Sequence, residues 1–169
     1  LQGCGYKVGL YTSPHFHTLR ERIQINFSPI EKNCLTELVG RIFPLVEKKW
    51  GTQRPLTFFE IMTLFSFVHF ASNKVDFQVI ETGIGGRLDA TNVVNPSLSV
   101  ITPISIDHTK LLGNTIEMIA QEKAGIIKPE APLVVSTQKE KALKVLSDVA
   151  SMNNVKLINT QSEISIKLI

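Results

Sequence analysis

A carboxylate and a glycine-rich loop follow a short hydrophobic run in the middle of the sequence. The run 77–80 is rich in strand-forming residues and ends at Glu81, so it predicts a buried strand of a parallel sheet. Ligands of open α/β sheets lie beyond the carboxyl ends of such strands, so we expect Glu81 to face a ligand. The glycines in 83–86 let the backbone turn sharply and approach that ligand, and Arg87 and Asp89 add one charge of each sign.

A second group of polar residues follows another hydrophobic run. The run 98–102 leads to Asp107 and His108, just before a segment that predicts a helix. Glu81 and His108 would then lie at two strand ends, within reach of one metal ion or phosphate. A carboxylate suits Mg²⁺, and an imidazole can complete a second metal site. The structural alternative is that Glu81 forms an ion pair with Arg87 and that His108 caps a loop.

Alternating strand and helix patterns predict an α/β fold with a doubly wound, mostly parallel sheet. We expect strands at 8–12, 76–81, 98–102, 133–136 and 155–158, and helices at 31–49, 57–72, 115–126 and 139–152. Thr57 and Glu60 have the spacing of a capping box at the start of the second helix. The charged segment 14–29 has no sustained period, so we expect a long loop there.

The composition is that of an ordinary globular domain. The 169 residues are 43% hydrophobic and 20% charged with a net charge of +3, which excludes a disordered chain and does not argue for nucleic acid. Cys4 and Cys34 have no metal-binding spacing, so we expect free thiols in a reducing compartment, with one disulfide as the alternative. No signal peptide or membrane span is visible, so a cytoplasmic location without a membrane partner is the default expectation.

The ends of the sequence do not resemble natural termini. The chain starts with Leu1 rather than Met, and it stops at Ile169 inside an alternating run at 164–169. We therefore expect residues 1–169 to be an internal fragment of a larger chain.

Several short motifs occur along the chain in a fixed order. They are Leu10-Tyr11-Thr12-Ser13-Pro14-His15, Arg20-Glu21-Arg22-Ile23, Thr57-Phe58-Phe59-Glu60, the loop 81–92, Asp107-His108 with Leu112-Gly113, and 122–127. In these motifs the chain resembles the folylpolyglutamate synthases and dihydrofolate synthases, folate-specific members of the Mur ligase superfamily. The resemblance extends from about Val8 to Pro132, and several motifs in order are more specific than one glycine-rich loop.

The resemblance implies an ATP-dependent amide ligase built on a Mur-ligase-like central ATPase domain of the P-loop NTPase type. In this family ATP phosphorylates a carboxylate to an acyl phosphate, which the amine of an amino acid then attacks. The expected substrates are dihydropteroate or reduced folates, L-glutamate and ATP, with Mg²⁺ as the expected cofactor and a monomer as the expected state. Dihydrofolate synthase activity, folylpolyglutamate synthase activity and a combination of both stay open.

The resemblance also assigns metal ligands and catalytic residues. Ser13 and Glu81 correspond to ligands of one Mg²⁺ ion, and His108 corresponds to the histidine of a second Mg²⁺ site. Lys123 corresponds to a lysine that the family carries in carbamylated form, in which CO₂ converts the ammonium group into an anionic oxygen donor. Glu81, His108 and Lys123 are therefore the expected catalytic residues, although Lys123 taken alone is more simply a surface lysine.

Two segments are assigned to a pterin-binding site by the same resemblance. The contacts correspond to Thr57, Phe58, Phe59, Glu60, Leu88, Asp89 and Ala90. Asp89 is expected to hydrogen-bond the amidine-like edge of the pterin, and Phe58 or Phe59 to pack on its rings. His15 and His17 look like a metal pair, but in a long loop we expect both to be solvated and assign neither of them a ligand role.

Two parts of the family pattern are missing from the sequence. No glycine is followed by lysine, so the phosphate-binding loop that normally precedes the Val8 strand is not found, and neither is the C-terminal domain. We expect the 169 residues alone to be inactive. One alternative is a nucleotide- or pterin-binding domain without catalysis. Another is a dinucleotide-dependent oxidoreductase built on Gly83 and Gly85, which the poor helix start at 87–93 disfavours.

Overall fold

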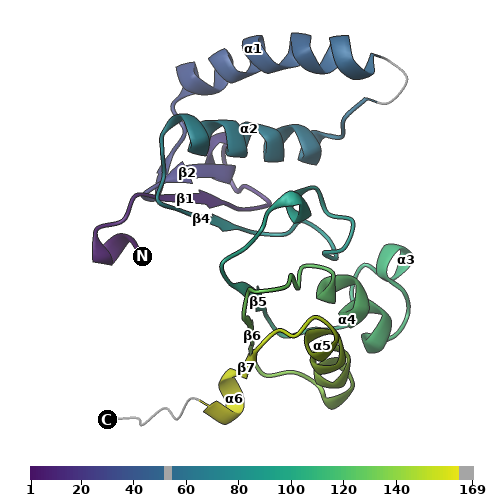
Figure 1. The fold of residues 1–169 in the computed structure, drawn as a ribbon. Coiled ribbons are helices and arrows are strands. Elements are labelled where there is room, and N and C mark those ends of the chain that lie inside the picture. Colours follow the sequence, from purple (N-terminus) through teal and green to yellow (C-terminus); the bar gives the residue numbers. More distant parts are fainter. Residues whose placement is uncertain (52–54, 164–169) are drawn as a thin grey trace. The chain divides into compact units, whose positions relative to one another are not determined.

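The computed structural model describes residues 1–51 and 55–163, which fold into two compact units. The units are Leu1–Gly83 and Ile84–Ile169, and each has its own sheet and hydrophobic core (Figure 1). The predicted α/β class is confirmed, but the described strands lie in two sheets rather than in one. The alternating segment 164–169 lies outside the described residues.

A mixed sheet forms the centre of the first unit. Its strands are β1 (Val8–Tyr11), β2 (Ile23–Ile25), β3 (Ser28–Pro29) and β4 (Phe77–Ile80), in the order β3-β2-β1-β4. β1 pairs in parallel with β4, with Tyr11 opposite Ile80, and antiparallel with β2, with Tyr11 opposite Ile23. The carboxyl ends of β1 and β4 therefore meet at one edge of this sheet.

The prediction of a long loop at 14–29 is wrong. The segment contains a 3₁₀ helix, η2 (Leu19–Arg22), followed by the antiparallel pair of β2 and β3. The two strands have only 3 and 2 residues. A period of two cannot be recognised over so few residues, because a strand pattern needs at least about four.

Strand β4 forms where the sequence predicted it, but the prediction that it is buried is wrong. Phe77 and Val79 expose 38% and 45% of their surface. In the described part of the chain β4 is an outermost strand, with β1 on one side only. Strand propensity reports residue type rather than place in the sheet, which is why sequence could not separate an edge strand from a central one.

Two helices cover the sheet of the first unit. Helix α2 (Phe58–Ser72) packs on β1, and helix α1 (Lys32–Trp50) packs on α2 (Figure 1). The predicted capping box starts α2: the Glu60 N–H donates to Thr57 Oγ1 at 3.2 Å, and the Thr57 N–H donates to the Glu60 carboxylate at 2.7 Å. The core between these elements contains Tyr11, Ile23, Leu38, Ile42, Met62, Phe65 and Phe70.

A parallel sheet forms the second unit. Its strands are β5 (Ser99–Ile101), β6 (Leu133–Val135) and β7 (Leu157–Asn159), in that order. Helices α4 (Ile116–Ala124) and α5 (Glu140–Met152) pack against each other beside the sheet (Figure 1). The short elements η3 (Ala90–Val93), α3 (Thr109–Leu112) and α6 (Thr160–Glu163) complete the unit. The sequence predicted these strands and the two longer helices in their places.

The two cysteines are exposed free thiols, as predicted. Cys4 lies in the 3₁₀ helix η1 (Gln2–Cys4), and Cys34 lies in the first turn of α1. Over residues 1–51 and 55–163, no helix combines the length and the apolar composition that crossing a bilayer requires.

β1 passes so close to α2 that position 9 accommodates only glycine. A Cβ atom on Gly9 would lie 2.7 Å from Cδ1 of the fully buried Phe70. We predict that Gly9→Ala lowers the free energy of unfolding by about 1–3 kcal/mol, the usual cost of overpacking a core. Urea denaturation followed by circular dichroism measures this change.

Gly40 provides the matched control, because the same substitution there meets no obstacle. It lies on the exposed side of α1, and no atom lies within 4 Å of an added Cβ. Gly40→Ala should raise the free energy of unfolding by about 0.5–1 kcal/mol, since alanine has less freedom to lose in a helix. Equal effects of the two substitutions would contradict the close approach of β1 to α2.

Candidate active site

Glu81 and Ser13 lie together at the carboxyl ends of β4 and β1. The Ser13 N–H donates to Glu81 Oε2 at 2.7 Å, and the Glu81 N–H donates to the carbonyl of Tyr11 at 2.9 Å. Parallel strand pairing thus joins two residues that are 68 positions apart in the sequence. Arg87 pairs with Glu122 at 3.0 Å instead, and Glu81 forms no ion pair within the described residues, so the structural alternative for Glu81 is not supported.

One carboxylate holds the loop that carries Ser13. Glu21 accepts N–H bonds from Phe16 at 2.8 Å, His17 at 3.1 Å and Thr18 at 2.7 Å. These donors lower the pKa of Glu21, with Phe16 as the largest contributor and Thr18 next, so the carboxylate stays ionised near neutral pH. Sequence analysis missed this role, although the Thr18–Glu21 spacing is that of a helix-capping pair.

Arg22 connects the same loop to the start of α2. Its Nε donates to His15 Nδ1 at 3.0 Å, and its guanidinium carbon lies 5.3 Å from the centroid of the Phe58 ring. The second contact is a cation–π interaction. Because Nδ1 is the acceptor, neutral His15 carries its proton on Nε2. The expectation that His15 is solvated is therefore wrong, since the ring is half-buried and binds Arg22.

Phe58 is the aromatic residue of segment 57–60 that is available to a ligand. It exposes 55% of its surface. Phe59 packs against the hydrophobic core instead, with its ring centroid 5.8 Å from that of Tyr11. The other two residues of the segment form the capping box of α2. Of the two candidates for stacking on a pterin, the structure therefore favours Phe58.

In the second unit, the glycine-rich loop lies directly against the end of α4. The Arg87 N–H donates to the Glu122 carbonyl at 2.9 Å, and the two side chains form an ion pair at 3.0 Å. A Cβ on Gly125 would lie 2.4 Å from Arg87 Cα, and one on Gly86 would lie 2.9 Å from the Glu122 carbonyl oxygen. This backbone contact fixes the loop relative to Lys123, which lies in the last turn of α4.

Asp89 stabilises the loop itself. Its Oδ1 accepts from the Thr91 N–H at 2.9 Å and the Thr91 hydroxyl at 2.6 Å, and its Oδ2 accepts from the Ile84 N–H at 3.0 Å. A carboxylate can accept further hydrogen bonds, so the pterin contact stays a prediction beside this structural role. Next to Asp89, Leu88 exposes 80% of its surface and is open to a ligand, whereas Ala90 is half-buried in η3.

His108 has a left-handed backbone conformation at the start of α3. Its φ is 50°, which costs a non-glycine residue about 1 kcal/mol or more. The side chain is 50% exposed, with Nε2 at 3.8 Å from Asp107 Oδ2. Lys123 is half-buried, and its ammonium group has no hydrogen-bond or ion-pair partner among the described residues. Both side chains thus remain available for the roles that the resemblance assigns.

The donor atoms at the edge of the first unit fit Mg²⁺. The Ser13 hydroxyl and Glu81 Oε1 make no hydrogen bond within residues 1–51 and 55–163, and Glu81 is exposed. Two hard oxygen donors open to water suit Mg²⁺, which usually keeps several of its own waters. No group of three or more His, Cys, Asp and Glu side chains in the described residues could hold a metal ion. The assignment of His108 and Lys123, which belong to the second unit, stays a prediction.

The glycine-rich loop does not open an α-helix. After Gly86 the chain continues through an irregular segment into the short 3₁₀ helix η3 (Ala90–Val93). A dinucleotide-binding loop leads directly into a helix whose N-terminus holds the pyrophosphate. The oxidoreductase alternative therefore has no support in the structure.

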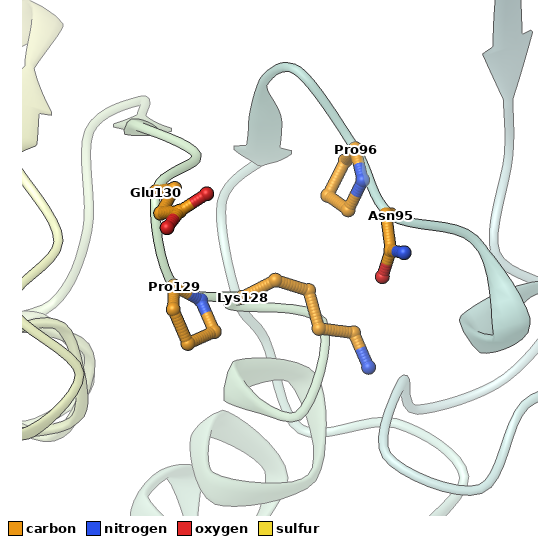
Figure 2. Close-up of a pocket in the computed structure, with 5 residues that line it drawn as sticks. All are labelled: Asn95, Pro96, Lys128, Pro129 and Glu130. Atoms are coloured by element: carbon orange, nitrogen blue, oxygen red, sulfur yellow. The ribbon is translucent and has the colours of Figure 1, made fainter.

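A shallow cavity in the second unit lies away from the candidate residues (Figure 2). It is lined by Asn95, Pro96, Lys128, Pro129 and Glu130, which precede β5 and β6. These are the amino ends of the parallel strands, whereas His108 follows the carboxyl end of β5. The Lys128 ammonium donates to the carbonyl of Asn92 at 3.3 Å, so this cation already has a hydrogen-bond partner within the protein. The cavity does not contain any of the predicted site residues.

The contact between the glycine-rich loop and α4 generates a stability prediction. Gly125→Ala should lower the free energy of unfolding by about 2–3 kcal/mol, because its Cβ would meet rigid backbone rather than a movable side chain. Hydrogen exchange of the Arg87 amide, which is bonded to the Glu122 carbonyl, should become faster. Gly40→Ala serves again as the control, and an unchanged exchange rate in Gly125→Ala would contradict the predicted clash.

Curated proteins similar to this chain are folate ligases. The dihydrofolate synthase/folylpolyglutamate synthase of Bacillus subtilis is 51% identical over 149 residues, which cover 86% of this chain and 34% of the relative. The mitochondrial folylpolyglutamate synthase of Homo sapiens is 40% identical over 153 residues, or 89% of this chain and 26% of the relative. The chain thus spans between about a quarter and a third of the length of these relatives. A scan against protein-family models gave no match.

Solved structures with the same fold belong to the same group. The apo form of L. casei FPGS superposes with a TM-score of 0.90 at 37% identity, covering 94% of this chain and 39% of that one. E. coli FolC, solved in complex with DHPP and ADP, gives a TM-score of 0.83 at 35% identity, covering 94% and 36%. Over the segment that it covers, the chain therefore belongs to the folylpolyglutamate synthase and dihydrofolate synthase family.

Proposed function

We propose that this chain is part of the ATP-dependent ligase domain of a longer protein that joins L-glutamate to dihydropteroate, to reduced folates, or to both. The observation that carries the proposal is the Ser13–Glu81 pair at the carboxyl ends of two parallel strands. Parallel α/β sheets bind their ligands at that edge. Relatives named for these ligase activities support the same conclusion.

The proposed reaction has two steps. ATP first transfers its γ-phosphoryl group to the carboxylate of the pterin substrate, which gives an acyl phosphate and ADP. The amine of glutamate then attacks the acyl carbon, loses a proton and displaces phosphate, which leaves an amide. Ser13 and Glu81 would hold the Mg²⁺ ion that neutralises negative charge on the phosphoryl oxygens.

The remaining predicted residues have complementary roles in this proposal. His108 and carbamylated Lys123 would supply a nitrogen and an oxygen donor for a second Mg²⁺ ion. Phe58 provides an exposed ring on which the pterin stacks. Asp89 would hydrogen-bond the pterin, and it also maintains the shape of the glycine-rich loop.

The test of the proposed function is an assay of the full-length protein that contains this chain. Glutamylated product should form from dihydropteroate or from reduced folate, glutamate and Mg-ATP, as measured by mass spectrometry. Glu81→Gln should lower kcat by about 100-fold or more, because the loss of a metal ligand removes several kcal/mol of charge stabilisation. Its thermal stability should hardly change, because Glu81 is exposed.

Glu130→Gln is the matched control for that experiment. Glu130 is an exposed glutamate that precedes β6 in the second unit and is not one of the predicted site residues, so its substitution should leave kcat within about twofold. Near-normal turnover of Glu81→Gln at saturating Mg²⁺ would refute the metal assignment. Binding of dihydropteroate without any product would favour the non-catalytic pterin-binding alternative.

Carbamylation of Lys123 is testable separately. We predict that activity of the full-length protein falls in bicarbonate-depleted buffer and recovers when CO₂ is restored, because an ammonium group repels Mg²⁺ whereas a carbamate binds it. Lys123→Ala should nearly abolish turnover, whereas Lys144→Ala, on the exposed face of α5, should not change it. A carbamate signal in ¹³C NMR with ¹³CO₂ checks the modification. Activity that changes neither on removal of CO₂ nor in Lys123→Ala would disprove it.

A further inference from the structure

Arg22 is an almost buried arginine whose two terminal nitrogens have no partner among residues 1–51 and 55–163. Only 9% of its surface is exposed. Its Nε donates to His15, and its guanidinium faces the Phe58 ring. Nη1 and Nη2 form no hydrogen bond or ion pair in the part of the chain that the structure describes. No fully enclosed side-chain nitrogen or oxygen there lacks a partner, so both nitrogens stay accessible from outside.

Holding a mostly buried guanidinium without an ionic partner lowers the stability of the fold, unless a ligand pairs with it. A charge that is mostly removed from water is normally paired, because only an ionic or hydrogen-bond partner offsets the free energy of desolvation. The ring of Phe58 attracts the guanidinium but accepts none of its in-plane N–H groups. After the bond to His15, four N–H donors remain in a planar fork, a geometry that matches the two oxygens of a carboxylate or a phosphate.

The location of Arg22 points to the candidate active site. The Thr12 N–H donates to the Arg22 carbonyl at 3.1 Å, and the next residue, Ser13, donates to Glu81 at 2.7 Å. Arg22 and Glu81 therefore flank the end of β1, one on the β2 side and one on the β4 side. Two strand spacings separate their backbones by about 10 Å, which two long side chains can bridge through a common ligand.

We propose that the Arg22 guanidinium binds an oxyanion of the reacting ligands at this edge, and that His15 and Phe58 position it. This inference rests on the proposed function. The oxyanion has two possible sources with the same chemistry: the carboxylate of the pterin substrate, and the γ-phosphate of ATP. Both groups meet beside the Ser13–Glu81 pair in the proposed reaction, and both accept the bidentate fork of an arginine.

Binding measurements on the full-length protein separate the two sources. The ligands are dihydropteroate, its analogue with a hydrogen atom in place of the carboxylate, and a non-hydrolysable ATP analogue with Mg²⁺. If the substrate carboxylate binds Arg22, Arg22→Met should weaken dihydropteroate about 10- to 100-fold and leave the decarboxylated analogue unchanged. If the γ-phosphate binds Arg22, the same loss should appear for the ATP analogue alone.

Arg20→Met is the matched control, since Arg20 lies in the same 3₁₀ helix but donates to the carbonyl of Ile30 at 3.1 Å. It should leave all three affinities unchanged. Arg22→Lys keeps the charge without the fork and should recover part of the lost affinity, and it replaces Arg22→Met if that variant does not fold. Calorimetric melting of each variant monitors folding.

Three outcomes would overturn the assignment to Arg22. They are unchanged affinities in Arg22→Met, equal losses for dihydropteroate and its decarboxylated analogue, and an effect confined to the KM of glutamate. Equal losses would mean that Arg22 only shapes the pocket. If the wild-type protein shows no ligase activity, the proposed function is refuted. If the wild type is active and Arg22→Met leaves all ligand affinities unchanged, only this inference is refuted.

Discussion

Parallel pairing of strands is the constraint on which the candidate site depends. In the first unit it brings the carboxyl ends of β1 and β4 to one edge, where Ser13 and Glu81 meet. In the second unit the same arrangement of β5, β6 and β7 puts the segment with His108 beyond a strand end. Because both strands of a parallel pair end at the same edge of the sheet, polar residues that follow them lie close together even when they are distant in sequence. Backbone pairing of the strands is sufficient to bring them there.

Carboxylates that accept backbone N–H groups give the loops at these edges their shape. Glu21 accepts from Phe16, His17 and Thr18. Asp89 accepts from Ile84 and Thr91, and Glu81 accepts from Ser13. Each bond satisfies a donor that a strand or helix would otherwise have paired, so an irregular segment can stay ordered at the surface.

Several residues of the candidate site have a structural role beside the ligand-binding role that we propose for them. Asp89 shapes the glycine-rich loop and is also proposed to bind the pterin, and Phe58 begins helix α2 while its ring contacts the guanidinium of Arg22. Loss of activity after a substitution here is therefore not evidence of a chemical role by itself. A change in the affinity for one ligand at unchanged stability is the informative result, because a folding defect affects all ligands alike.

The sequence by itself determined the α/β class, the longer helices, the capping box of α2 and the residues that end the strands, because periodicity, capping spacing and residue type are local properties. The tertiary structure decided the rest. It brought the Ser13 backbone N–H into a hydrogen bond with Glu81, paired Arg87 with Glu122 rather than with Glu81, and packed Phe59 against the core while leaving Phe58 exposed. Among the described residues, it also put β4 at the outside of its sheet and left the two terminal nitrogens of Arg22 without a partner. Each of these depends on which distant segments pack together, and no local pattern encodes that information.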